Sequence, residues 1–150
     1  MAAAAALLVP SFACMSNDKK AIGLQLYSLR DELPKDLKGT IEKVAKAGFK
    51  EVETYGFSIK DQFWGLKPGE FKKLLDGNGL TSPSGHFGLG TFLTDGNTDE
   101  LKAAIAAAKV LGSEYITIPW LDESIRKTAD DYKKIALKII LILSFKVYFS

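Results

Sequence analysis

Four strand-like segments recur along the chain at a nearly constant spacing, and this repeat limits the folds that the sequence can adopt. Successive segments begin about 30 residues apart, which is the size of one strand-plus-helix unit, at Ile22, Lys50, Leu80 and Glu114. Each segment is followed by apolar residues at helical spacing. This alternation predicts a parallel sheet, because each helix returns the chain to the same end of the sheet.

The expected helices have recognisable starts. Pro34 is predicted to begin the first one, because proline needs no N–H partner in a first turn. Asn97 and Glu100 predict a capping box at the third helix, and Thr128 with Asp131 is predicted to cap the fourth. Two α/β architectures fit this order: an open doubly wound sheet, or a (β/α)8 barrel of which about four units are present.

Composition excludes several classes of function. The chain has 150 residues, with 20 Lys and Arg against 18 Asp and Glu, so its net charge of +2 argues against a nucleic-acid partner. One Cys and one His exclude an intrachain disulfide, a cysteine-cluster metal site and a multi-histidine metal site within the chain. With 47% hydrophobic residues, the chain is not intrinsically disordered.

The first 20 residues are typical of an export signal rather than of a folded domain. A small apolar run, Ala2–Val9, is followed by Ala13 and Cys14, which resemble the end of a bacterial lipobox, where the cysteine carries a lipid anchor. This pattern predicts a signal peptide and an exported, periplasmic or membrane-anchored lipoprotein. The alternative is an alanine-rich tail on a cytoplasmic protein.

Residues 137–150 depart from the pattern of the chain before them. Acidic residues end at Asp131, and Ile139–Leu143 is apolar on every side of a helix. A transmembrane helix needs about 20 apolar residues, so this segment is too short to be one. We consider a buried final strand or a frameshifted, truncated end, and favour the second because residue types change abruptly after Ala136. The folded domain is then expected over residues 21–136.

Polar and aromatic residues stand near the carboxyl ends of the strand-like segments, where α/β folds place their chemistry. By strand alternation, Gln25 and Tyr27 share one face of the first segment, Glu53 lies in the second, His86 ends the third and Trp120 ends the fourth. Aromatic rings stack on sugar rings and polar groups bond hydroxyls, so we predict these five residues as substrate contacts. Each residue also has an alternative, non-functional role. Tyr27 and Trp120 could pack in the core, Glu53 could form an ion pair at the rim, Gln25 could belong to a polar layer of the barrel interior, and His86 could be a hydrogen-bonded loop histidine.

Several segments resemble bacterial sugar phosphate isomerase/epimerase proteins of the xylose isomerase-like barrel family. The resemblance covers about residues 21–136 and is carried by Ile22–Asp31, Ala47–Glu53, Ser84–Phe87, Ala107–Ile116 and Pro119-Trp120. It implies a TIM barrel, of which this chain holds the N-terminal half. It also implies a sugar or sugar phosphate as the substrate, and a place in carbohydrate metabolism.

The resemblance further implies a divalent metal (Mn, Mg, Co or Zn) that supports an enediol-type proton transfer. In the family the metal-binding residues lie in later strands, so no metal ligand and no catalytic residue is assigned in this chain. We therefore expect this chain to be the N-terminal half of a sugar isomerase/epimerase and to be inactive by itself. Whether it is an enzyme is left open. The alternative is a non-enzymatic sugar-binding half-barrel that self-associates into a homo-oligomer.

Overall fold

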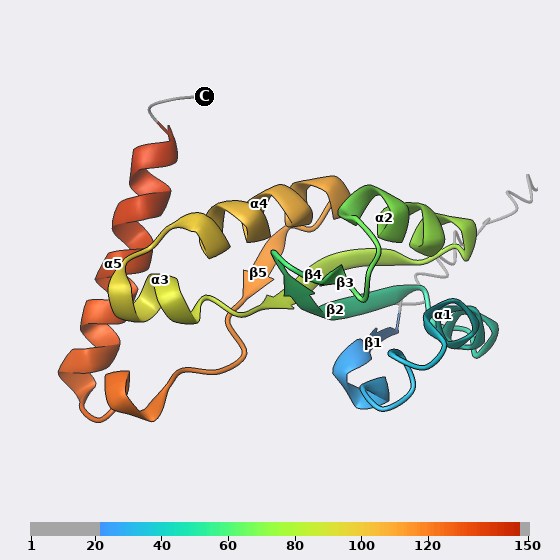
Figure 1. The fold of residues 1–150 in the computed structure, drawn as a ribbon, viewed down its shortest axis with the longest axis horizontal. Coiled ribbons are helices and arrows are strands. Elements are labelled where there is room, and N and C mark those ends of the chain that lie inside the picture. The colour runs from blue at the N-terminus through green and yellow to red at the C-terminus, as the bar shows by residue number, and fades with distance from the viewer. Residues whose placement is uncertain (1–21, 148–150) are drawn as a thin grey trace, which may run out of the picture.

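The computed structural model describes residues 22–147, with side chains described up to residue 140, and its helices and strands alternate around one sheet (Figure 1). The strands are β1 (Gly23–Gln25), β2 (Glu51–Ser58), β3 (Gln62–Phe63), β4 (Thr81–Phe87) and β5 (Tyr115–Thr117). The α-helices are α1 (Leu37–Lys46), α2 (Pro68–Gly77), α3 (Gly90–Asp95), α4 (Asp99–Leu111) and α5 (Ala129–Val147). Two 3-10 turns are η1 (Leu26–Leu29) and η2 (Glu123–Ile125).

The sheet has the order β1-β2-β4-β5, and these four strands are parallel, as the repeat predicts. The short β3 pairs antiparallel with the end of β2. In the register of the sheet, Gln25 pairs with Glu53, Glu53 pairs with Ser84, and His86 pairs with Thr117. The topology therefore brings the polar ends of four different strands side by side.

One face of the sheet is covered by helices. Figure 1 shows α2 and α4 lying along the same side of the strands, and the two helices contact each other. Val52 and Thr54 of β2 are buried on this side, whereas Glu53 between them is only half-buried, as expected for side chains that alternate across a strand. The helices bury mainly Phe71 and Leu75 from α2 and Ala104, Ala107, Ala108 and Leu111 from α4.

The first strand is shorter than predicted. It ends at Gln25, and Tyr27 lies in η1, so the expectation that both residues share one face of a strand is wrong for Tyr27. The cause is local: the Gln25 side chain accepts a hydrogen bond from the Tyr27 N–H at 2.8 Å, and the Arg30 N–H bonds back to the Tyr27 carbonyl at 3.2 Å. These bonds favour a turn over continued strand pairing.

The prediction that Pro34 begins a helix is also wrong. Helix α1 begins at Leu37, and its N-cap is Asp36, whose carboxylate accepts a hydrogen bond from the Gly39 N–H at 2.9 Å. A capping carboxylate satisfies a free N–H of the first turn and complements the helix dipole. Pro34 lies in the turn before this cap.

The predicted cap of the last helix forms, whereas the predicted capping box at the start of α4 does not. Thr128 and Asp131 cap each other's N–H groups at the start of α5, at 2.9 and 3.2 Å. At α4, Asn97 instead bonds a backbone N–H two residues later, and the Glu100 carboxylate accepts the N–H of Thr91 in α3 at 3.0 Å. The Glu100 side chain therefore links two helices rather than closing a box.

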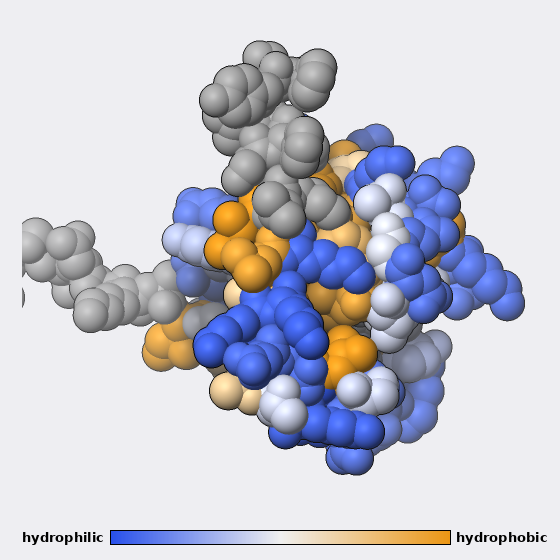
Figure 2. All heavy atoms as spheres, turned by 90° about the vertical axis from the view of Figure 1, so that its left-hand side faces the viewer, coloured by the Kyte–Doolittle hydropathy of each residue, from blue (hydrophilic) through white to orange (hydrophobic). Residues whose placement is uncertain are grey.

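Helix α5 continues to Val147, so the interpretation of the apolar end as a buried strand is wrong. No glycine or proline interrupts residues 129–147, and the cap at Thr128 fixes the start of the helix. Figure 2 looks at this end of the molecule, where hydrophobic patches stand among hydrophilic side chains. Leu137 of α5 is 59% exposed. The frameshift interpretation and the domain boundary at 136 stay predictions.

The predicted export leader, including Cys14, lies outside the described residues. Within residues 22–147, no helix combines the length and the apolarity that crossing a membrane requires.

Candidate functional site

Five polar side chains from four strands form a connected group, here called the carboxylate cluster, around Glu53. One carboxylate oxygen, Oε2, accepts a hydrogen bond from Gln25 Nε2 at 2.5 Å and lies 3.3 Å from His86 Nε2. The other, Oε1, accepts hydrogen bonds from Ser84 at 2.5 Å and from Thr117 at 3.3 Å. Both oxygens of Glu53 are thus held in place by neighbouring strands.

The surroundings of Glu53 favour its ionised form. Partial burial acts to raise the pKa of this carboxyl, but hydrogen bonds from Ser84 and Gln25, the nearby His86 and a bond from Thr117 together lower the pKa below its usual value of 4.5. Hydrogen bonds to a carboxylate stabilise the charge in this way. At neutral pH, Glu53 is therefore a fixed negative charge and a hydrogen-bond acceptor.

Gln25 is oriented by the backbone. Its Oε1 accepts the N–H of Tyr27, so its NH₂ group faces the cluster, with Nε2 3.2 Å from His86 Nε2. The imidazole nitrogen consequently has an amide donor on one side and a carboxylate acceptor on the other. The backbone turn that moves Tyr27 out of the strand is the same feature that fixes this amide.

A cavity of about 490 Å³, within the usual range of small-molecule sites, opens in front of His86. Three of the five predicted site residues, Tyr27, His86 and Trp120, line it. The other lining residues are Tyr55, Gly56, Phe57, Gly88 and Pro119. Gln25 and Glu53 do not line this cavity but bond directly to one another beside His86. All five predicted residues are therefore brought into one region.

Two tyrosines form one side of the cavity and are called the aromatic wall here. The rings of Tyr27 and Tyr55 meet edge to face, with centroids 5.2 Å apart. Behind them, the Trp64 ring meets Tyr55 at 5.0 Å in a second edge-to-face contact. The Arg30 guanidinium lies 5.1 Å from the centroid of the Tyr27 ring. The cavity thus combines flat aromatic surfaces with an imidazole and a neighbouring carboxylate.

Comparison with known proteins identifies the fold. No family model matches the sequence, and no curated protein matches it. Solved structures do match, among them two that are both described as sugar phosphate isomerase/epimerase from Parabacteroides distasonis ATCC 8503. One is 25% identical over 79% of this chain and 44% of its own, with a TM-score of 0.59. The other is 25% identical over 81% of this chain and 50% of its own, with a TM-score of 0.57.

This chain has the sugar phosphate isomerase/epimerase fold. It spans about half the length of each of these two structures. The resemblance seen in the sequence is thereby confirmed, as is the α/β fold class of the (β/α)8 type, here with four parallel strands and the helices between them.

Within this sugar isomerase/epimerase fold, two site residues sit differently from their predicted places. Trp120 does not end a strand, since β5 stops at Thr117, but it still reaches the cavity from the following loop. Tyr27 reaches the same cavity from η1. Trp120 and Tyr27 are both more than half exposed, at 63% and 52%.

Sequence reasoning did not include Tyr55, Ser84 and Thr117 among the site residues. Tyr55 and Ser84 carried a usable signal, because Tyr55 lies two residues after Glu53 on the same strand and Ser84 two residues before His86. Thr117 carried no such signal, because its contact with Glu53 depends on β5 ending at this residue. Trp64 stands with Phe57 and Phe63 in the aromatic segment that follows Glu53, a pattern that fits either a pocket lid or the anchor of a long loop.

The described residues do not fit the divalent metal that the sugar isomerase/epimerase resemblance implies. Among residues 22–140, no group of three or more His, Cys, Asp or Glu side chains is placed to hold a metal ion. Both oxygens of Glu53 already accept hydrogen bonds. Besides Glu53, the carboxylate cluster contains one other side chain of a type that commonly binds divalent metals, His86. The metal and its ligands therefore stay a prediction.

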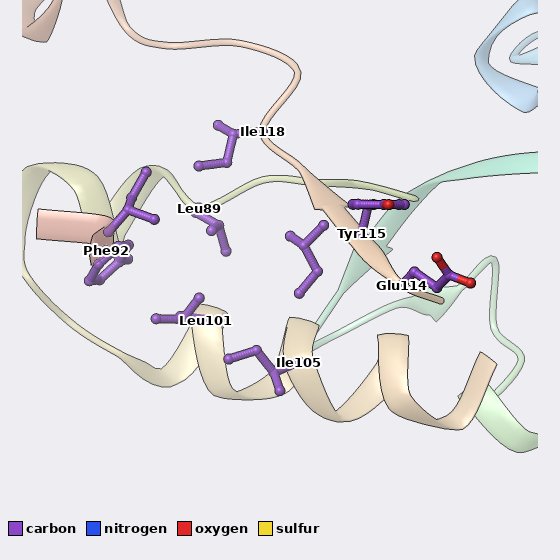
Figure 3. A pocket seen from close by; sticks show the side chains of 9 residues that line it. Leu89, Phe92, Leu101, Ile105, Glu114, Tyr115 and Ile118 are labelled. Carbon is purple, nitrogen blue, oxygen red and sulfur yellow. The ribbon is translucent and has the colours of Figure 1, made fainter. Parts of the chain in front are cut away.

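A second cavity, of about 290 Å³, lies between α4 and the strand and loop residues near β5. Figure 3 shows Leu101 and Ile105 rising from α4 toward Leu89 and Phe92. Its lining is apolar apart from Glu114 and Tyr115, and it shares no residue with the cavity at His86. Polar groups converge at the carboxylate cluster and not here, so the cavity beside the cluster is the candidate site.

Proposed function

We propose that this chain binds a sugar, as substrate of an isomerase or epimerase, in the cavity lined by the aromatic wall, His86 and Trp120. The observation that carries the proposal is the Glu53–His86 pair, 3.3 Å apart beside this cavity. A sugar presents C–H faces that pack on aromatic rings and hydroxyls that need donors and acceptors. Two solved structures that share this fold are described as sugar phosphate isomerase/epimerase proteins, which supports the same substrate class.

Each group in the site has a chemical task in this proposal. Tyr27, Tyr55 and Trp120 exclude water from one face of the sugar. His86 contacts a hydroxyl, and Glu53 fixes the orientation of the imidazole. Isomerisation and epimerisation both move a proton at a carbon next to a carbonyl group, and a positioned imidazole beside a carboxylate can hold a proton close to that carbon.

Calorimetric titration with D-xylose, D-fructose and D-glucose tests the proposal. The wild-type chain is expected to bind at least one of them, and Glu53→Gln is expected to weaken that binding about tenfold, or 1.4 kcal/mol. Glu51→Gln, on the same strand but outside the cluster, is the matched control and is expected to bind as the wild type does. Absence of binding to all three sugars, or equal binding by wild type and Glu53→Gln, contradicts the proposal.

Turnover is measured separately from binding. Incubation of the bound sugar in D₂O with added divalent metal, followed by NMR, reports deuterium incorporation next to the carbonyl group. Incorporation above the protein-free rate identifies an isomerase or epimerase, whereas binding without incorporation identifies a sugar-binding protein.

A second candidate function, a sugar-binding half-barrel that assembles from two copies, is favoured by the edge of the sheet. Among the described residues, β5 pairs only with β4, and Tyr115 on this edge strand is 64% exposed. Unpaired strand edges invite pairing with another chain. Sedimentation equilibrium over a range of concentrations tests this candidate: Tyr115→Lys is expected to shift a dimer toward monomer, and a wild-type monomer at every concentration contradicts it.

A further inference from the structure

A strained turn after β2 holds Trp64 next to the aromatic wall. Gln62 and Trp64 have φ values of +54° and +50°, in the left-handed region that residues other than glycine rarely adopt. Such conformations persist only where surrounding contacts over-determine them, and they are concentrated at ligand sites and active sites. The strain therefore raises the question of what the turn positions.

The turn is anchored by the residue between the two strained positions. Phe63 is fully buried, and its ring stacks on Phe71 of α2 with centroids 4.7 Å apart and planes at 21°. Phe63 and Leu66 exchange two backbone hydrogen bonds, at 3.0 and 2.9 Å, and the Gly65 N–H donates to the Asp61 carbonyl at 2.8 Å. With Phe63 locked in the core, the backbone on either side has little freedom.

The indole of Trp64 lies against the elements that line the cavity without lining it itself. Its ring meets Tyr55 at 5.0 Å and an interplanar angle of 75°, and Tyr55 in turn meets Tyr27. At Gly56, whose φ is +76°, an added Cβ would stand 3.2 Å from the indole. The indole thus packs on the backbone just after Tyr55, and both sides of Tyr55 are in contact with an aromatic ring.

We propose that Trp64 is a positioning residue for the sugar cavity, which acts by fixing the ring of Tyr55 and, through it, the ring of Tyr27. The inference rests on the proposed sugar-binding function for its ligand, but its structural part can be tested without one. An aromatic wall that is already ordered in the free chain binds the sugar more tightly, because its side chains lose less conformational entropy on binding. The strained turn is the element that keeps the indole in place.

The first test compares sugar affinities. For the sugar that the wild-type chain binds among D-xylose, D-fructose and D-glucose, Trp64→Ala is expected to raise Kd about tenfold, or 1.4 kcal/mol. Trp64→Phe, which keeps a ring at this position, is expected to restore most of the affinity. Trp64→Leu, which removes the aromatic ring but fills more of its space than alanine, is expected to weaken binding as well. Tyr132→Ala, which removes a half-exposed aromatic ring on α5, is the matched control and is expected to leave Kd unchanged.

The second test needs no ligand. In a chain labelled at tyrosine, the NOE between the ring protons of Tyr27 and Tyr55 is expected in the wild type and in Trp64→Phe, and is expected to be lost in Trp64→Ala. If the NOE is retained in folded Trp64→Ala, or in Trp64→Leu where Trp64→Ala does not fold, the proposal is overturned whatever the sugar affinity. If Trp64→Ala loses the NOE and the wild-type chain binds none of the three sugars, the positioning role is supported and the proposed function is contradicted.

Discussion

The Nε2 atom of His86 lies 3.3 Å from the same Glu53 oxygen that accepts a 2.5 Å hydrogen bond from Gln25. Three parallel strands, β1, β2 and β4, contribute one group each to this arrangement, so its geometry depends on the register of the sheet. Ser84 and Thr117 occupy the second oxygen. The cluster therefore stabilises one state of Glu53, the ionised one, and this state can be probed by pH.

The stability that Glu53 contributes is expected to depend on pH. Its pKa in the folded chain lies below the usual 4.5, so its contribution is fully present above that value and is lost as the pH falls through the lowered folded pKa. Urea unfolding at pH 7 and pH 3 is therefore expected to show a larger free-energy difference between wild type and Glu53→Gln at pH 7. An equal Glu53→Gln difference at both pH values contradicts the prediction.

Removal of Ser84's hydroxyl is expected to raise the pKa of Glu53. After burial, which raises this pKa, the Ser84 hydrogen bond is the largest influence on it, and the Thr117 bond is the smallest of the four that lower it. Ser84→Ala should therefore raise the pKa more than Thr117→Val does. Titration of the ¹³C-labelled Glu53 carboxyl by NMR measures both, and the reverse order would show that the Ser84 bond does not dominate.

The centre of the site could be predicted from the sequence because it depends on two simple periodicities. Alternation along β2 separates Glu53 from the buried Val52 and Thr54, and the repeat of strands and helices predicts that Gln25, Glu53 and His86 end at the same edge of the sheet. The structure brings these three side chains together. Their role as sugar contacts stays a prediction.

The rest of the site depends on contacts that local patterns do not encode. Tyr27 leaves the strand because a glutamine side chain two residues earlier caps its N–H, which strand alternation does not foresee. Trp64 reaches Tyr55 through a turn in which Gln62 and Trp64 adopt left-handed backbone without glycine. That conformation is imposed by the burial of Phe63 against α2, a tertiary contact, and not by the residues of the turn.

Phe63 is expected to be among the most sensitive core positions. It is fully buried and packs on Phe57 at 5.0 Å as well as on Phe71, so Phe63→Ala leaves a cavity and releases the turn. The free energy of unfolding should fall by about 3–5 kcal/mol, the usual range for a buried phenylalanine. Ile59→Ala, at an exposed position in the same loop, should change it by less than about 0.5 kcal/mol in urea unfolding. A cost of Phe63→Ala as small as that of Ile59→Ala would show that the turn does not depend on this anchor.

Thr54→Val is expected to stabilise the chain. The Thr54 side chain is fully buried on the helix-covered face of β2, and among the described residues its hydroxyl has no hydrogen-bond partner. It packs where Gly85 leaves room, since a Cβ at Gly85 would lie 2.5 Å from the hydroxyl oxygen. Valine has the same shape without the polar atom, so the free energy of unfolding should rise by about 1 kcal/mol, the lower end of the cost of a buried unpaired group. Thr81→Val, at an exposed hydroxyl on β4, is the control and should change stability by less than about 0.5 kcal/mol. A loss of stability in Thr54→Val would mean that the hydroxyl bonds a group, such as a buried water, that offsets its burial.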